Sequence, residues 1–322
     1  MPKVYVTRRV PEPAASMLAA KNFTVATNPD DRVLSRQELL KAAVGADALL
    51  ALLTDKIDGE VMDAAGPQLK IVANYAVGYD NIDLAAAKDR GIIVTNTPGV
   101  LTEAVAEHAF ALLMAIARRV PESDAFMRAG GYVGWAPMLL LGTEVHDKVL
   151  GIVGLGRIGS SLAQKAVKGF GMRVVYYDVK PSEEFERAFG ARYCGLSELL
   201  KESDFVSIHV PLIPATKHLI DEKALKGMKK GAYLINTSRG PVIDEVALVK
   251  ALGEGWIAGA ALDVFENEPK LAPGLANCAN VVLTPHTASA TLETRSAMAR
   301  IAAENIIAVL EGKEPPNPVK AS

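Results

Sequence analysis

Cysteine and aromatic residues are scarce in this 322-residue sequence, and neither sign of charge dominates it. With only Cys194 and Cys278, the chain has no disulfide framework and no metal-ligand spacing, so we expect no metal and a cytoplasmic setting. The formal net charge of -2 provides no basic surface for nucleic acid.

Long hydrophobic runs are missing as well. The longest, AFALLMAIA at 109–117, has about half the length of a membrane span. The first residues, MPKVYVTRRVPEP, look like a charged strand and not like a signal peptide. We therefore expect no membrane segment and no membrane partner. With 50% hydrophobic and 22% charged residues the composition is that of a globular protein, and the length favours two domains.

Short apolar or β-branched runs alternate with helical patterns along the chain. This alternation predicts parallel sheets covered by helices, the α/β class. A long apolar helix expected at 101–119 separates two such series, and the second series begins at Val149. In the first series we expect strands at 3–7, 23–26, 46–52, 69–74 and 91–96, with helices at 13–21, 35–44 and 84–90.

The end of the chain predicts how the two series form domains. One amphipathic helix is expected at 289–311, and it follows the last strand of the second series. Such a helix can return the chain to the first domain. We therefore expect a discontinuous substrate domain of residues 1–99 and 288–322, with a dinucleotide-binding domain of residues 100–287 inserted. Both domains are expected to be Rossmann-like or flavodoxin-like parallel-sheet folds.

The stretch VLGIVGLGRIGSSLAQKAVKGFGMRVVYYD predicts a dinucleotide site. Its three glycines fit G-x-G-x-x-G, between a strand at 149–153 and a helix at 158–167. The first glycine allows a tight turn, the second lets the backbone approach a pyrophosphate, and the third lets helix and strand pack closely. A helix N-terminus then faces the phosphates. The predicted loop residues are Gly154, Leu155, Gly156, Arg157, Ile158 and Gly159.

An acidic residue at the end of the next strand favours NAD over NADP. Asp178 follows Gly159 by 19 residues. A carboxylate there accepts hydrogen bonds from an adenosine ribose and repels a 2′-phosphate. Lys180, two residues further on, weakens this preference because a cation tolerates a phosphate.

A nicotinamide cofactor carries a hydride, so the protein has to supply a proton, and histidine is the usual acid near neutral pH. Of the five histidines, His108 looks like a packed residue of the apolar helix, and His146 and His218 look solvated. His209 ends a strand and either lines the adenosine pocket or simply packs there. His286 follows the strand NVVLTPH, at the edge where ligands bind in such sheets. Its alternative role is that of a hinge histidine without chemistry.

Four motifs in this order resemble the D-2-hydroxyacid dehydrogenases: GLGRIG, INTSRGPVIDEVALVKAL, GAALDVFENEP and VVLTPHTAS. The resemblance covers essentially the whole chain and is closest to the glyoxylate/hydroxypyruvate reductase branch. It implies NADH-linked reduction of a small 2-oxo acid to the 2-hydroxy acid by a homodimer. The alternatives are a D-lactate or 3-phosphoglycerate dehydrogenase, or a non-catalytic NAD-sensing protein.

The resemblance also implies three catalytic residues. Arg239, at the end of a predicted strand with no acidic residue directly beside it, is expected to clamp the substrate carboxylate. Glu268 is expected to bond His286 and to favour its imidazolium form. His286 then donates the proton in reduction and accepts it in oxidation. The nearby Glu266 matches a non-catalytic position of the family.

Further positions follow from the same resemblance. The N–H groups of Val77 and Gly78 are expected to bind the substrate carboxylate. Asp263 is expected to hold the nicotinamide carboxamide, with Thr237 and Ser238 along the cofactor and Thr102 at its phosphate or ribose. Leu53 and Trp135 resemble substrate-pocket positions, Trp135 from a second subunit, with ordinary packing as the alternative.

One departure from the family lies directly after the catalytic histidine. The usual run is H-x-G-S, and here Ala288 replaces the glycine, beside the nicotinamide. Either the local φ is negative and alanine costs nothing, or its methyl group tightens the pocket.

Overall fold

The computed structural model describes residues 1–320 and divides into two compact units. Unit 1 takes Met1–Leu101 and the C-terminal stretch from Ala290, and unit 2 takes Thr102–Ser289. The division expected from the sequence, after residue 99 and before residue 288, lies two residues from each of these boundaries.

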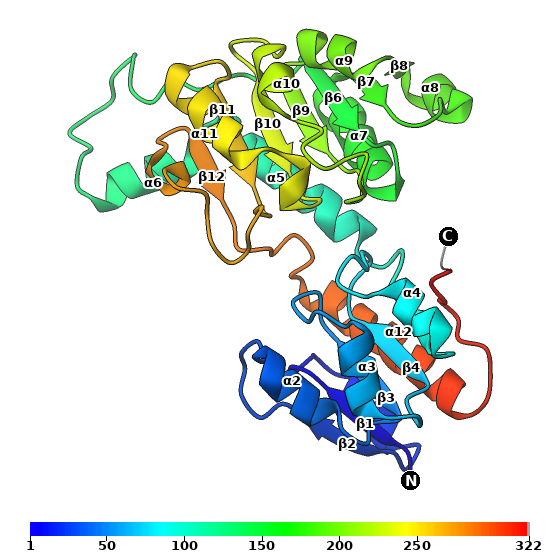
Figure 1. Cartoon of the computed structure of the whole chain (residues 1–322). Coiled ribbons are helices and arrows are strands. Elements are labelled where there is room, and N and C mark those ends of the chain that lie inside the picture. Colours follow the sequence, from blue (N-terminus) through cyan, green and yellow to red (C-terminus); the bar gives the residue numbers. More distant parts are fainter. Residues whose placement is uncertain (321–322) are drawn as a thin grey trace. The chain divides into compact units, whose positions relative to one another are not determined.

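Unit 1 is built on a parallel sheet of five strands in the order β2-β1-β3-β4-β5 (Figure 1). This is the doubly wound order of flavodoxin-like folds. The strands are β1 (Lys3–Val6), β2 (Thr24–Thr27), β3 (Ala48–Ala51), β4 (Ile71–Asn74) and β5 (Ile93–Thr95). The helices are α1 (Ala14–Ala19), α2 (Arg36–Ala43), α3 (Gly59–Ala65), α4 (Leu84–Asp89) and α12 (Leu292–Leu310).

The central strands of unit 1 show why these residues form a buried parallel sheet. Every residue of β3 and β4 is buried, so the runs ALLA and IVAN show no polar alternation. Helices on both faces produce this pattern. Helices α2, α3, α4 and α12 begin at residues whose side chains bond the first turn, as in α2, where Ser35 and Glu38 form a capping box.

Unit 2 contains a parallel sheet of seven strands in the order β12-β11-β10-β9-β6-β7-β8 (Figure 1). The order reverses between β6 and β9, as in dinucleotide-binding sheets, where ligands bind at the reversal. The strands are β6 (Val149–Val153), β7 (Arg173–Tyr177), β8 (Arg192–Tyr193), β9 (Phe205–Ile208), β10 (Tyr233–Asn236), β11 (Gly259–Leu262) and β12 (Val281–Leu283). The helices are α5 (Thr102–Ala117), α6 (Val120–Arg128), α7 (Arg157–Phe170), α8 (Glu183–Phe189), α9 (Leu196–Glu202), α10 (Glu222–Lys226) and α11 (Glu245–Glu254). The predicted α/β class with two parallel sheets is confirmed.

The long apolar helix expected at 101–119 is α5. It packs on the sheet of unit 2, where Leu112 and Leu113 join a core that includes Leu150 and Phe205. Arg119, with a left-handed φ of +53°, separates it from α6. Helix α6 was not predicted from the sequence, and its nine residues bury no side chain.

Candidate active site

The glycine loop joins β6 to α7 at the carboxyl edge of the unit 2 sheet. Gly154 has a φ of +98°, and a Cβ there would lie 2.9 Å from the backbone of His209. A Cβ on Gly159 would lie 2.2 Å from the carbonyl oxygen of Gly154, so this glycine lets helix and strand pack closely. A Cβ on Gly156 would meet nothing within 4 Å. The space over the middle of the loop is therefore open to a ligand.

The N-terminus of α7 fits a phosphate group. Gly156 caps this 14-residue helix without a side-chain hydrogen bond, which leaves its first N–H groups available. The positive end of the helix dipole also attracts an anion. Arg157 is exposed, while Leu155 and Ile158 pack partly against the sheet. Together with the space at Gly156, these features fit the pyrophosphate of a dinucleotide.

Asp178 lies at the end of β7, beside the glycine loop. Its Oδ2 accepts a hydrogen bond of 2.7 Å from the N–H of Leu155, and its Oδ1 accepts one of 2.6 Å from the N–H of Val179. The carboxylate is thus fixed at the side of the loop where an adenosine ribose binds in such folds. Lys180 is exposed nearby.

Arg239, Glu268 and His286 come together at the carboxyl ends of three neighbouring strands, β10, β11 and β12. His286 Nδ1 lies 3.0 Å from Glu268 Oε2. Burial of Glu268 opposes its ionisation, but the hydrogen bond with His286 and the charges of His286 and Arg239 outweigh burial. The pKa of Glu268 is therefore below its usual range, and its carboxylate is ionised at neutral pH.

A close backbone contact explains the glycine of the S-R-G motif. A Cβ on Gly240 would lie 1.9 Å from the carbonyl carbon of Phe265, so the turn after β10 packs directly on the loop after β11. Asn236 fixes this turn. Its Nδ2 donates to the carbonyl oxygen of Arg239 at 3.0 Å, and its Oδ1 accepts from the N–H of Ser238 at 3.0 Å. The position of Arg239 therefore depends on this backbone packing.

His286 has a left-handed backbone, with a φ of +54°, which is uncommon for a residue with a Cβ. Asp263 supports it from both sides. The carbonyl oxygen of Asp263 accepts from the N–H of His286 at 2.9 Å. Its buried carboxylate accepts from the N–H groups of Thr287 and Ala288, both at 2.8 Å, and from the hydroxyl of Thr284 at 2.6 Å. Asp263 thus fixes the segment 284–288 around His286.

The backbone at Ala288 answers the question raised by the missing glycine. Within residues 1–320, the non-glycine residues with positive φ are Asn22, Arg119, Leu140, Asp147, His218 and His286. Ala288 is not among them, so alanine meets no backbone strain there. Its side chain is buried, and its N–H is bonded to Asp263.

His108 is part of the same network, and this is a role that the sequence analysis missed. Its Nε2 lies 3.1 Å from Thr284 Oγ1 and 3.4 Å from Asp263 Oδ1. Because the Thr284 hydroxyl donates to Asp263, its oxygen accepts from His108. Burial opposes ionisation of Asp263, but the bonds from His108, Thr284 and the two backbone N–H groups hold its pKa below the usual range. The sequence contains no signal for this contact, because His108 and Thr284 are 176 residues apart.

Four other predicted cofactor residues lie along the same edge or at the start of α5. Thr237 is buried, and among the described residues its hydroxyl has no hydrogen-bond partner. Ser238 Oγ bonds Asn236, and Thr102 is the first residue of α5. His209 lies 2.9 Å from Ser207 Oγ, and loss of hydration lowers its pKa to about 3, so it is neutral at pH 7. Their contacts with a cofactor stay predictions.

Unit 1 contains Val77, Gly78 and Leu53. Val77 and Gly78 are half-buried in the loop after β4, and Leu53 is half-buried in the loop after β3. Asn81 joins these loops, because its Nδ2 donates to the carbonyl oxygens of Leu52 and Asp55, both at 3.1 Å. The roles of Val77, Gly78 and Leu53 toward a substrate stay predictions.

Trp135 belongs to an exposed apolar arm, which we define as residues 131–141. Its side chain is 83% exposed, and that of Val133 is 99% exposed. Tyr132, Met138, Leu139 and Leu141 are also exposed. The alternative interpretation of Trp135 as an ordinary packed residue is therefore wrong within this chain.

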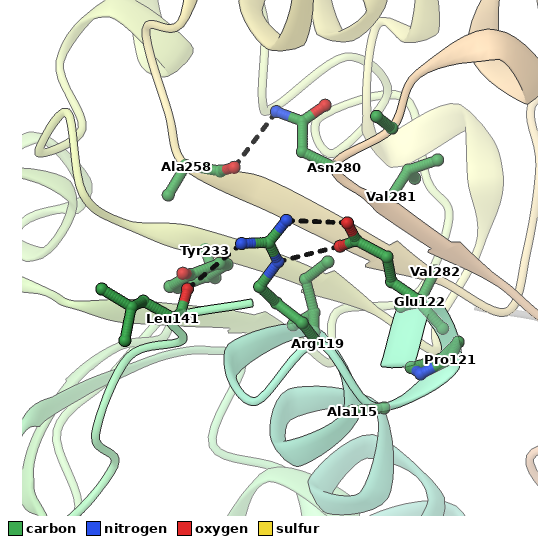
Figure 2. Close-up of a pocket in the computed structure, with 12 residues that line it drawn as sticks. Ala115, Arg119, Pro121, Glu122, Leu141, Tyr233, Ala258, Asn280, Val281 and Val282 are labelled. Atoms are coloured by element: carbon green, nitrogen blue, oxygen red, sulfur yellow. Dashed lines mark hydrogen bonds and ion pairs between the residues drawn. The ribbon is translucent and has the colours of Figure 1, made fainter. Parts of the chain in front are cut away.

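A cavity of about 280 Å³ lies at the opposite edge of the unit 2 sheet. Figure 2 shows its lining, with Arg119 bonded to both carboxylate oxygens of Glu122 and to the carbonyl oxygen of Leu141. Tyr233 and Val281, the first residues of β10 and β12, also line it. Because the catalytic candidates follow the other ends of these strands, this cavity is separate from them.

Two acidic residues, Glu245 and Glu266, are bonded to each other's segments next to Glu268. Glu266 Oε1 lies 2.7 Å from His218 Nε2, so His218 is hydrogen-bonded and not simply solvated as expected. The N–H of Glu266 donates to Glu245 Oε1 at 2.7 Å. Burial and the charges of Glu266 and Glu268 raise the pKa of Glu245. Glu266 thus has a structural role next to Glu268, while His146 is exposed beside Asp147.

Across residues 1–320, no helix is long and apolar enough to cross a membrane. In the same residues no group of three or more His, Cys, Asp or Glu side chains is arranged to hold a metal ion. Cys194 and Cys278 are both free thiols.

Comparisons with known proteins agree with this geometry. Residues 110–288 match the family model of the D-isomer specific 2-hydroxyacid dehydrogenase NAD binding domain. A protein of Korarchaeum cryptofilum named glyoxylate reductase is 54% identical over 98% of this chain and 95% of its own length. A glyoxylate reductase of Pyrococcus furiosus is 51% identical over 98% and 94%.

Solved structures give the same result. The TT0316 protein of Thermus thermophilus superposes with a TM-score of 0.93 at 48% identity, over 99% of this chain and 100% of that one. A glyoxylate reductase of Paecilomyes thermophila superposes with a TM-score of 0.87 at 33% identity, over 99% and 98%. The family match, the relatives and the glycine-loop fold agree, and the chain belongs to the D-isomer specific 2-hydroxyacid dehydrogenases, a family of NAD-binding oxidoreductases.

Proposed function

We propose that the protein reduces glyoxylate, and hydroxypyruvate as a second substrate, to the 2-hydroxy acid with NADH as the preferred cofactor. The observation that carries the proposal is the contact between His286 Nδ1 and Glu268 Oε2 at 3.0 Å, in the field of Arg239. The names of the relatives favour glyoxylate as substrate. The complete Arg–Glu–His set favours an enzyme over a non-catalytic NAD-binding protein.

The chain's own residues provide acid–base chemistry and charge. The bound nicotinamide supplies the hydride. Glu268 is ionised, accepts a hydrogen bond from the Nδ1–H of His286 and so keeps the other ring nitrogen, Nε2, directed away from it. In reduction His286 donates its Nε2 proton to the carbonyl oxygen, and in oxidation it accepts a proton from the hydroxyl group. Arg239 pairs with the substrate carboxylate, which is a charge-assisted bond worth roughly 1.5–3 kcal/mol.

The preference for NADH rests on Asp178. Its carboxylate, fixed by the N–H groups of Leu155 and Val179, faces the ribose position and repels a 2′-phosphate. Gly154, Leu155, Gly156, Arg157, Ile158 and Gly159 then hold the pyrophosphate. Thr102, His209, Thr237, Ser238 and Ala288 complete the cofactor contacts that we assign.

Asp263 has two roles in this proposal. Its carboxylate already accepts protein donors on both oxygens, so its first role is to hold the segment that carries His286. Each carboxylate oxygen accepts more than one hydrogen bond. A contact with the nicotinamide carboxamide, its second role, is therefore compatible with these bonds.

Leu53 and Trp135 are assigned to the substrate pocket, and Trp135 is assigned to the pocket of a second copy. The exposure of the arm 131–141 supports a homodimer, because an apolar segment of this kind is usually covered by a partner. The working compartment is the cytoplasm, in keeping with two free thiols.

The test is oxidation of NADH and NADPH with glyoxylate, hydroxypyruvate and pyruvate in parallel. We expect fast turnover of glyoxylate with NADH and much slower turnover with NADPH. A preference for NADPH would remove the assigned role of Asp178. Absence of turnover with all three acids, in a protein that binds NADH, would contradict the proposed function.

A further inference from the structure

In the loop 75–81 after β4, the carbonyl oxygens of residues 76–78 are bonded, whereas the N–H groups of Val77 and Gly78 are not. The carbonyl oxygen of Ala76 accepts from the N–H of Thr97 at 2.9 Å. That of Val77 accepts from Asn96 Nδ2 at 2.8 Å, and that of Gly78 accepts from Asn74 Nδ2 at 2.7 Å. Within residues 1–320 the N–H groups of Val77 and Gly78 donate no hydrogen bond. Two adjacent donors are therefore available at the carboxyl end of a buried parallel strand.

The bonded carbonyl groups fix the direction of these donors. In a trans peptide the C=O and the following N–H point in opposite directions. The bond from Asn96 to the carbonyl of Val77 thus sets the direction of the Gly78 N–H. In the same way, the bond from Thr97 to the carbonyl of Ala76 sets the direction of the Val77 N–H. The peptide units of 76–78 are trans, because the cis bonds of the chain are at Pro13 and Pro269.

The side chains that hold the loop are neutral and well anchored. Asn74 is 1% exposed and also bonds Asn81, which in turn donates to the carbonyls of Leu52 and Asp55. Asn96 directly follows β5. A lysine in place of Asn96 would itself attract a carboxylate, and an aspartate would repel both the Val77 carbonyl and an incoming anion. A neutral amide fixes the carbonyl and leaves the N–H groups as the local attraction for an anion.

We propose that Asn96, supported by Asn74 and Asn81, is a positioning residue that directs the N–H groups of Val77 and Gly78 toward the carboxylate of the substrate. This inference rests on the proposed function for the identity of the substrate. Asn96 itself does not touch the substrate. It acts through the peptide unit of Val77 and Gly78, so its removal affects capture of the carboxylate and leaves proton transfer by His286 intact.

The test compares Asn96→Ala with a matched variant, Asn28→Ala. Asn28 is buried, whereas Asn96 is half-buried, and Asn28 likewise follows a strand of the same sheet and donates its Nδ2 to a backbone carbonyl, that of Arg32 at 3.1 Å. Both variants lose one part-buried amide–carbonyl bond, and Asn28→Ala also loses the bond from the N–H of Asp30 to Asn28 Oδ1. We expect the KM for glyoxylate to rise about tenfold in Asn96→Ala, with the KM for NADH unchanged, and neither constant to change in Asn28→Ala.

A second readout uses binding without turnover. Calorimetric titration of the NADH-bound full-length chain with oxalate should show about tenfold weaker binding in Asn96→Ala than in the unmutated protein and in Asn28→Ala. If Asn96→Ala does not fold, Asn96→Ser, which keeps a short donor, is measured in the same two assays with the same expected direction. Equal KM and oxalate affinity in the folded Asn96 variant and the unmutated protein would overturn the inference.

The two assays separate this inference from the proposed function. A protein whose affinity for oxalate falls in Asn96→Ala but which does not reduce glyoxylate would contradict the proposed function alone. A protein that reduces glyoxylate with no effect of Asn96→Ala would contradict the inference alone. An equal loss of affinity in Asn28→Ala and Asn96→Ala would also overturn it, because a general loosening of unit 1 would then explain both.

Discussion

Two loops that follow parallel strands, 75–81 in unit 1 and 284–288 in unit 2, are held by polar side chains of opposite kinds. In the first loop, the amides of Asn74 and Asn96 donate to backbone carbonyls and leave N–H groups available. In the second loop, the carboxylate of Asp263 accepts two backbone N–H groups and leaves a side chain, His286, fixed in position. Side-chain amides thus leave backbone N–H groups available in one loop, while a buried carboxylate fixes a histidine side chain in the other.

The largest expected effect comes from replacing His286, which the loop 284–288 carries. His286→Gln should lower kcat with glyoxylate by about 10²- to 10⁴-fold, because glutamine does not transfer a proton near neutral pH. The KM for NADH and the affinity for oxalate should change little. His146→Gln, at an exposed histidine, is the control and should match the unmutated protein in kcat. A kcat for His286→Gln within about threefold of normal would exclude His286 as the acid.

Asp263→Asn places an amide where the loop 284–288 needs a hydrogen-bond acceptor. One oxygen becomes an NH₂ group that faces N–H or hydroxyl donors, so segment 284–288 loses at least one bond. We expect a loss of about 1–3 kcal/mol in unfolding free energy and a fall in kcat of about 10- to 100-fold. Urea unfolding and steady-state kinetics measure the two effects.

Asp204→Asn is the matched control for Asp263→Asn. Asp204 also accepts a backbone N–H, that of Val149 at 2.9 Å, but it lies just before β9 and thus at the opposite edge of the sheet. It should lose stability with kcat nearly unchanged. If both variants lost kcat to the same extent, Asp263 would have no specific role in holding His286.

Gly240→Ala tests whether backbone packing places Arg239. The new Cβ would lie 1.9 Å from the carbonyl carbon of Phe265, so the turn after β10 has to move. We expect about 1–3 kcal/mol of destabilisation and a several-fold higher KM for glyoxylate. Gly253→Ala, in α11 with nothing within 4 Å of its Cβ, should instead be neutral or stabilising. A normal KM in Gly240→Ala would separate the position of Arg239 from this contact.

The smallest expected effect concerns the stability of the fold at acidic pH. The folded pKa of Asp263 lies below its usual value, so its ionisation stabilises the fold above the unfolded pKa of about 3.9. That stabilisation is lost as the pH falls through the folded pKa. Between about pH 5 and pH 3, the urea midpoint should fall further for the unmutated protein than for Asp263→Asn. The two curves should run parallel if Asp263 has no lowered pKa.

Most of the fold could be predicted from the sequence, because the patterns that indicate strands, helices and the glycine loop are local. Alternating strand and helix patterns predicted two parallel sheets, and the glycine spacing predicted the strand–turn–helix unit at β6 and α7. Not every helix was predicted: α6 buries no side chain, and the seven-residue helix α3 was not among the helices expected in the first series.

The candidate site could be predicted only in part from the sequence. Residues that carry chemistry, such as Arg239 and His286, follow strands and lie within quoted motifs. The residues that hold them do so through contacts between distant parts of the chain. His108 was interpreted as packed, yet it bonds Thr284, and Asn96 holds a carbonyl 19 positions earlier. A hydrogen bond of this kind depends on which strand ends are neighbours, which the chain order alone does not specify.

The most direct test of the account is one glyoxylate saturation experiment with NADH in excess on three proteins: unmutated, Asn96→Ala and Asp263→Asn. We predict that Asn96→Ala mainly raises KM and that Asp263→Asn mainly lowers kcat. In our proposal the loop 75–81 binds the substrate carboxylate, and the loop 284–288 holds His286, the acid. The same parameter changing by the same factor in both variants would contradict it.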